Sequence, residues 1–208
     1  MKLLICTQTV DTNDPILGFF VRWIEEFAKH CEQVTVICLR EGKHSLPGNV
    51  RVHSLGKERA TTSRAAYAWR FLSLAWNLRN EYDAVIVHMN PEYVVLGGIP
   101  WKARGKKVAL WYTHKSVNLM LRIAALFANI IFTASKESFR LKSNKIHVMG
   151  HGIDTNFFTP DASVARGEWI DLTALRLPDG TAVSPAGVVG CDSPTAKAAR
   201  QVAFEEMT

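Results

Sequence analysis

Short apolar segments recur along the first three quarters of the chain and alternate with segments of helical periodicity. Seven of them are rich in β-branched and other apolar residues and are bounded by polar or turn residues, which predicts strands. They cover residues 2–7, 33–39, 50–55, 83–88, 107–112, 129–133 and 145–149. Because nearly all their positions are apolar, we expect a parallel sheet that is covered on both faces.

Helical periodicity appears between most of these strands. Asp14 and Pro15 are typical of a helix start, and apolar residues then recur at helical spacing up to Phe27. Further helices are predicted at about 62–79, 92–103 and 116–127, where Ser116 would be the cap, and Ser135 would cap a brief one. The alternation predicts an α/β fold, a doubly wound parallel sheet in one Rossmann-like domain over residues 1–160.

The alternation stops near Pro160. Residues 161–208 are rich in Ala, Gly, Thr, Ser and Pro and show no strand–helix order. We therefore expect an irregular C-terminal tail that is poorly ordered, or the product of a truncation or frameshift. A natural flexible extension is the alternative.

Composition and charge narrow the possible partners. Hydrophobic residues make up 48% and charged residues 21%, as in globular domains. The net charge is +6, but the tail has four basic and seven acidic side chains, so residues 1–160 carry +9. Such a body would favour anionic lipid headgroups or phosphate-bearing substrates, and a solvated basic surface is the alternative. Aromatic and basic residues are not interleaved, so no nucleic-acid partner is expected.

Neither a membrane-spanning run nor a signal-peptide pattern is evident, and we expect a cytoplasmic protein that is at most peripheral at the inner face of the membrane. The four cysteines form no C-x-x-C pair, so no metal site is predicted.

Four loops follow the predicted strands at the end where doubly wound sheets bind ligands. Their candidate substrate-binding residues are Gly18, His88, Asn90, Lys115 and Gly152, and Ser135 is a further candidate after the strand at 129–133. Gly18 permits close backbone approach to a ligand, although a lone glycine at a helix start more often serves packing. Asn90 precedes a proline and is a good turn residue on structural grounds alone. Lys115 would start a helix whose N-terminus favours an anion. Gly150 and Gly152 permit a turn with positive φ.

Five segments, taken in their order and spacing, resemble the first domain of family-4 retaining glycosyltransferases. They are LGFFVRWIEEFAKHCEQVTVICL, YDAVIVHMNPEYVVLGG, KKVALWYTHKS, NIIFTASKESFRL and KIHVMGHGIDTNFFTP. The resemblance implies two Rossmann-like domains around a cleft. The first would bind a glycan or lipid-linked acceptor, and the second would bind the sugar nucleotide as co-substrate, with no cofactor and no metal. It also implies that His114 points to the reacting sugar, which makes it the predicted catalytic residue.

The sequence also departs from this family. The first loop has the single Gly18 where a glycine pair is usual, and His151 stands where asparagine is common. The donor-binding residues of the second domain, an Arg, a Lys and two glutamates seven residues apart, cannot be placed. We therefore expect the acceptor-binding half of a glycosyltransferase, inactive alone.

Two alternatives remain open at the level of sequence. One is a non-catalytic acceptor-binding subunit that needs a donor-domain partner chain. The other is a different Rossmann-like nucleotide-dependent enzyme, such as a dehydrogenase or epimerase. The loop TQTVDTNDPILG lacks the glycine fingerprint of dinucleotide binding, which argues against a dehydrogenase.

Overall fold

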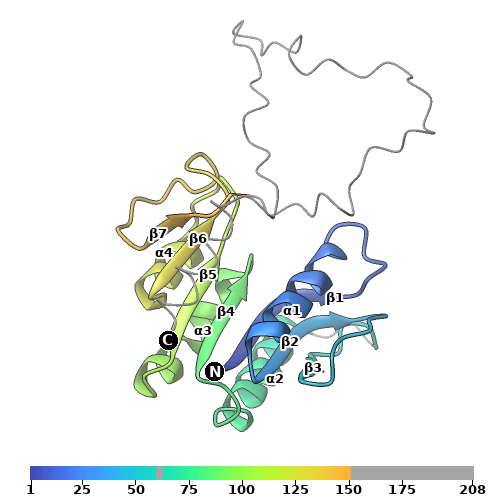
Figure 1. Ribbon diagram of the computed structural model, residues 1–208. Helices are drawn as coiled ribbons and strands as arrows, with labels where there is room; N and C mark the ends of the chain where they lie inside the picture. Colours follow the sequence, from blue (N-terminus) through green and yellow to red (C-terminus); the bar gives the residue numbers. More distant parts are fainter. Residues whose placement is uncertain (60–62, 151–208) are drawn as a thin grey trace, which may run out of the picture. The chain divides into compact units, whose positions relative to one another are not determined.

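The computed structural model describes residues 1–59 and 63–150, which contain one seven-stranded sheet (Figure 1). The strands are β1 (Lys2–Val10), β2 (Gln33–Glu41), β3 (Val50–Ser54), β4 (Ala84–His88), β5 (Lys107–Trp111), β6 (Ile130–Thr133) and β7 (Ile146–Val148). Their order is β3-β2-β1-β4-β5-β6-β7, and every neighbouring pair is parallel. The predicted doubly wound α/β fold is confirmed.

Four helices connect the strands and pack on the two faces of the sheet. They are α1 (Phe19–His30), α2 (Arg64–Asn77), α3 (Pro91–Ala103) and α4 (Leu119–Phe127). From β1 to β3 the chain moves toward one edge of the sheet, and from β4 to β7 it moves toward the other edge. Because crossover connections are right-handed, α1 covers one face while α2, α3 and α4 cover the opposite face.

The core on the α2–α4 side is a continuous apolar cluster. It takes alternate residues of the strands, such as Leu4, Cys6 and Val87, and packs them against the inner sides of the helices. Two buried aromatic residues have their polar atoms satisfied: Trp101 Nε1–H donates to the Tyr82 hydroxyl at 3.0 Å, and that hydroxyl donates to the Ala75 carbonyl at 2.9 Å. Such bonding avoids the cost of burying unpaired polar groups.

Apart from Glu92 and Lys102 near its ends, helix α3 is apolar, and it packs against both α2 and α4. The approach of α3 to α4 is close at Gly98, where a Cβ atom would lie 2.4 Å from Cγ of Phe127. Glycine at this position thus allows the two helices to pack at their observed separation.

Every predicted strand is present, and the helix starts are where the structure differs from the predictions. The predicted helix start at Asp14 and Pro15 is wrong, because α1 begins at Phe19 and residues 11–18 form a loop. The predicted Ser116 cap is wrong as well: α4 begins at Leu119, and Asn118 Oδ1 accepts the Leu121 N–H at 2.8 Å. Lys115 accordingly lies in the preceding loop. The residues after Ser135 form a turn, so the predicted brief helix is also wrong. Gly150 has φ 75, as its predicted turn requires.

The predicted tail at 161–208, the boundary at residue 160 and the candidate Gly152 lie outside the described residues. Within the described ranges, no helix combines the length and the apolar character needed to cross a membrane.

Candidate functional site

The sequence candidates that the structure describes lie at one edge of the sheet. Because all strands are parallel, their carboxyl ends meet there, and we call it the carboxyl edge. Loops 11–18, 89–90, 112–118 and 134–145 follow β1, β4, β5 and β6 respectively. His88 is the last residue of β4, and Gly18, Asn90, His114, Lys115 and Ser135 lie in these loops. This is the edge where open parallel sheets bind ligands.

Gly18 is explained by packing within its own loop. A Cβ atom at this position would lie 2.6 Å from the Asp14 carbonyl oxygen and 2.8 Å from that of Thr12. Its φ of −56 is ordinary, so close approach, rather than an unusual backbone conformation, selects glycine. The first loop therefore folds tightly back on the start of α1.

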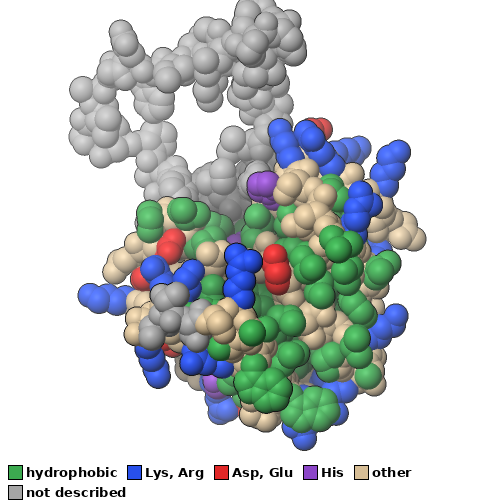
Figure 2. All heavy atoms as spheres, turned by 180° about the vertical axis from the view of Figure 1, so that it is seen from behind, with side chains coloured by type: hydrophobic (Ala, Val, Ile, Leu, Met, Phe, Trp, Pro, Cys, Tyr) green, Lys and Arg blue, Asp and Glu red, His purple; other side chains and the backbone are tan. Residues whose placement is uncertain are grey.

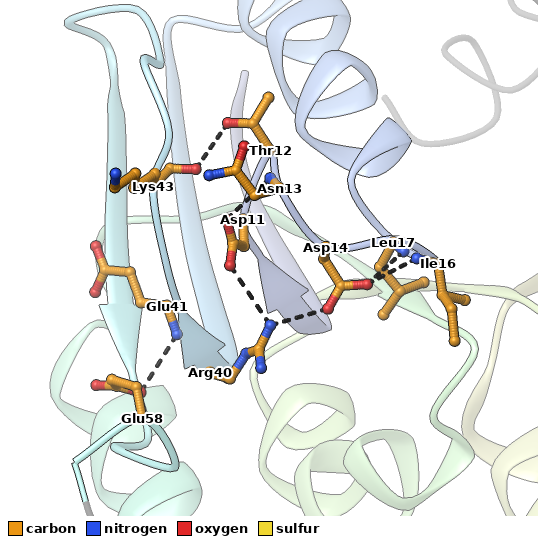
Figure 3. A network of polar contacts seen from close by, with 10 residues as sticks. All are labelled: Asp11, Thr12, Asn13, Asp14, Ile16, Leu17, Arg40, Glu41, Lys43 and Glu58. Carbon is orange, nitrogen blue, oxygen red and sulfur yellow. Dashed lines mark hydrogen bonds and ion pairs between the residues drawn. The ribbon is translucent and has the colours of Figure 1, made fainter.

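Arg40, near the end of β2, holds the same loop through two ion pairs, which Figure 3 shows. Its Nη2 lies 3.0 Å from Asp14 Oδ2 and 3.5 Å from Asp11 Oδ2. Asp14 Oδ1 also accepts the backbone N–H groups of Ile16 at 3.0 Å and Leu17 at 2.8 Å. These backbone bonds, followed by the charge of Arg40, lower the pKa of Asp14. Sequence reasoning missed Arg40, whose only signal is a charge directly after a predicted strand.

His88 is a packed residue rather than an exposed one. Its side chain is 2% exposed, and its ring stacks on Phe20 of α1 with centroids 4.0 Å apart. Thr7 Oγ1, within β1, lies 3.3 Å from His88 Nδ1. Burial lowers the pKa of His88 to about 4, so the ring is neutral near pH 7. His88 thus ties α1 to β1 and β4 beneath the site, which favours a structural role.

The loop after β4 is tied to the loop after β5. Met89 has φ 61, which is uncommon for a residue with a side chain, and no sequence signal indicates it. Its Sδ accepts both the N–H and the hydroxyl of Thr113, each at 3.3 Å. The side chain of Asn90 does not cap α3 but donates to the His88 carbonyl at 3.2 Å. Glu92 in the first turn of α3 makes that helix end unfavourable for an anion.

His114 is exposed, and its neighbour fixes its tautomer. The Ser116 N–H donates to His114 Nδ1 at 3.1 Å, and Ser116 Oγ lies 2.8 Å from the same nitrogen. Because Nδ1 accepts these bonds, the proton of the neutral ring is on Nε2. The ring therefore offers a single N–H donor from an oriented, exposed position.

Lys115 lies near the turn that follows β6, so these two candidate loops come together. Glu137 in that turn has a lowered pKa, first because of its own backbone N–H and the Ser135 hydroxyl, and then because of the charges of Lys136 and Lys115. Ser135 Oγ also accepts the Ser138 N–H at 3.2 Å.

A hollow of about 290 Å³ lies beside the same turn, between Thr133 at the end of β6 and Val148 at the end of β7. Its lining includes Lys136, Arg140 and Lys142, which sequence reasoning did not single out. The cations at this part of the carboxyl edge would attract an anionic group.

Metal ligands are not gathered in this region. Among residues 1–59 and 63–150, no three His, Cys, Asp or Glu side chains are placed to hold a metal ion. The cysteines of this part of the chain, Cys6, Cys31 and Cys38, are buried free thiols. Burial raises the pKa of each, so they are unreactive packing residues.

No protein-family model matches this chain, and no curated protein matches it in sequence. Several solved structures do resemble it. HepE of Anabaena in complex with UDP and glucose is 14% identical with a TM-score of 0.54, over 78% of this chain and 48% of that one. HepE in complex with UDP is 18% identical with a TM-score of 0.51, over 78% and 47%.

UDP-GlcNAc 2-epimerase from Neisseria meningitidis, bound to UDP-GlcNAc, is 14% identical with a TM-score of 0.50, over 72% of this chain and 46% of that one. The chain thus spans about half the length of the structures it resembles. At these identities the likeness establishes a shared fold: the described domain has the same doubly wound α/β architecture as part of these proteins.

Proposed function

We propose that this chain is the acceptor-binding part of a family-4 retaining glycosyltransferase. The reaction would move a glycosyl group from a sugar nucleotide to a lipid-linked or polysaccharide acceptor at the cytoplasmic face of the membrane. The observation that carries the proposal is the exposed, oriented His114 at the carboxyl edge of a sheet whose fold is shared with structures holding UDP, glucose or UDP-GlcNAc.

His114 is the residue proposed to contact the reacting sugar. Its Nε2–H would donate to a sugar hydroxyl, and Ser116 orients the ring by occupying Nδ1. Lys115 and the Ser135 turn would hold an anionic or hydroxyl-rich part of the acceptor. Gly18, His88 and Asn90 would act indirectly, by shaping and supporting the loops.

The transfer itself needs more than these residues. The bond between the anomeric carbon and the diphosphate oxygen breaks, and the acceptor hydroxyl oxygen bonds to that carbon and gives its proton to the leaving diphosphate. Negative charge develops on the diphosphate in the transition state. A preorganised clamp of cations or N–H donors is needed for that charge. The proposal assigns this clamp to a donor domain, with the sugar nucleotide as co-substrate and neither cofactor nor metal.

Acceptor binding by the purified chain tests the proposal. Saturation-transfer NMR with a panel of oligosaccharides and water-soluble prenyl-diphosphate sugars should show binding of one acceptor class. His114→Ala should weaken that binding about tenfold, the loss of about one hydrogen bond. His44→Ala is the control, because His44 contacts Glu41 of β2 and lies outside the four loops 11–18, 89–90, 112–118 and 134–145.

Two outcomes would contradict this assignment. If no acceptor binds, the domain is not an acceptor site. If the chain alone transfers sugar robustly from any sugar nucleotide, it is not merely the acceptor half.

A second candidate, an epimerase acting on a sugar nucleotide, is favoured by the fold shared with the Neisseria enzyme. The two functions differ in their need for an acceptor. Incubation of the chain with UDP-GlcNAc alone, followed by proton NMR, should leave the substrate unchanged. Inversion at C2 of the sugar would replace the transferase proposal with an epimerase.

A further inference from the structure

Large apolar side chains are exposed on the outer surface of three neighbouring helices. Trp69 on α2 is 73% exposed and Trp76 is 53% exposed, while Ile99 on α3 and Leu126 on α4 are 70% and 72% exposed. We call this surface the outer helical face. Soluble domains rarely gather several such side chains in one region unless the region binds something.

A hollow of about 330 Å³ lies between α2 and α3 on this face. Trp69, Leu72 and Trp76 of α2 line it, together with Pro100 and Trp101 of α3. Arg79, two residues after the end of α2, and Arg104, directly after α3, also line it. The Arg79 guanidinium carbon is 4.9 Å from the centroid of the Trp76 ring, so cation and aromatic ring form one amphipathic unit.

The charge of the three helices, with the residues just after α2 and α3, is almost entirely of one sign. The segments 64–79, 91–104 and 119–127 contain six cationic side chains, Arg64, Arg70, Arg79, Lys102, Arg104 and Arg122, and one acidic side chain, Glu92. Figure 2 looks onto this side of the molecule and shows hydrophobic side chains gathered over it, with Lys and Arg around them and few acidic groups. By contrast, α1 carries two basic residues, Arg22 and Lys29, and two glutamates.

We propose that the outer helical face docks onto an anionic lipid bilayer. Trp69, Trp76 and the exposed aliphatic residues enter the interfacial region, where amphipathic aromatic rings are favoured. Arg79 and Arg104 lie beside them and bind lipid phosphates. Exposed apolar side chains flanked by cations are typical of protein surfaces that lie in the plane of the membrane interface.

Charge decides between a membrane and a second copy of the chain. A twofold dimer through this face would place each cationic surface against an identical one, and like charges oppose such an interface. An anionic bilayer is complementary both to the cations and to the apolar side chains. The docking goes beyond the proposed transfer reaction and does not depend on it.

Vesicle flotation of the full chain, without any sugar nucleotide, tests the docking. The chain should float with vesicles of phosphatidylcholine and phosphatidylglycerol in equal parts and much less with pure phosphatidylcholine. Binding should weaken at high salt, because screening shortens the reach of the cations. Trp69→Ser and Arg104→Glu should each weaken partitioning about tenfold.

Matched controls separate this face from general effects. Ile16→Ser removes an apolar side chain that is 77% exposed on the first loop, and Lys57→Glu makes the same charge change outside the three helices. Both should float like the unchanged protein, and thermal unfolding followed by circular dichroism verifies that every variant is folded.

The docking proposal is overturned if the unchanged chain does not float with anionic vesicles. It is equally overturned if the control variants lose as much binding as the variants of the outer helical face. It is also overturned if sedimentation shows a dimer that Trp69→Ser dissociates while no vesicle binding occurs. In that case the face is an interface between two copies.

Discussion

The two sides of the sheet are covered in different ways. On one side, α1 turns most of its apolar residues inward, where Phe20 stacks on His88, and its Lys, Arg and Glu charges are balanced. On the other side, α2, α3 and α4 enclose a larger apolar core and also expose tryptophans and cations outward. The inner sides of the helices already cover the sheet on both faces. The apolar residues that point outward from α2, α3 and α4 are therefore not explained by packing of the core.

This difference separates two uses of similar residues. Aromatic side chains near α1 support the carboxyl edge, where the candidate site lies. Tryptophans on the outer helical face contribute little to the fold and are therefore available for contact with a partner. Stability measurements can test that division, because they respond to buried contacts and hardly to exposed ones.

The largest expected effects come from aromatic residues buried on each side. Phe20→Ala and Phe71→Ala should each lower the free energy of unfolding by about 4 kcal/mol, because both side chains are at most 1% exposed and leave large cavities. Urea denaturation measures the change. Phe19→Ala and Trp69→Ser are the exposed counterparts and should cost less than about 1 kcal/mol. A Trp69→Ser loss as large as that of Phe71→Ala would mean that the outer helical face belongs to the core.

Acid should lower the free energy of unfolding, because His88 is buried beneath α1 as a neutral ring. The pKa of the buried ring is lowered from 6.5 to about 4, so the unfolded chain binds the proton more readily than the folded one. This stabilising contribution is complete above pH 6.5 and is lost as the pH falls toward 4, by about 3 kcal/mol in all.

The matched variant for this prediction is His88→Gln, which does not titrate. Urea denaturation at several pH values between 7.5 and 4 should show a shallower loss of stability for this variant than for the unchanged chain. If the free energy of unfolding falls equally with pH in both proteins, burial beneath α1 does not lower the pKa of His88.

A smaller effect is expected at the first loop of the site. Asp14→Ala removes the acceptor of two backbone N–H groups and the partner of Arg40, and should lower the free energy of unfolding by about 1 kcal/mol. Arg40→Met removes a cation whose side chain is 42% exposed and should cost less than that. Thermal unfolding would rank the two variants, and the reverse order would make the ion pair, rather than the backbone hydrogen bonds to Asp14, the main support of the loop.

Much of the candidate site could be predicted from the sequence because strand ends are visible in it. Knowing where parallel strands end is enough to predict that His88, Asn90, His114 and Ser135 share one edge. The chain pattern could not show which of them is buried. His88 and His114 both end or follow apolar strands, yet the first is packed beneath α1 and the second is exposed.

By itself, the sequence determined all seven strands, their parallel character and the edge that carries the candidate site, because apolar periodicity records local burial directly. Only the tertiary structure decided where α4 starts, that Arg40 fastens the first loop and that tryptophans on α2 lie beside arginines that follow α2 and α3. Those features depend on contacts between residues that are distant along the chain or on competing local caps. The pattern of apolar and polar residues along the chain records neither kind of interaction.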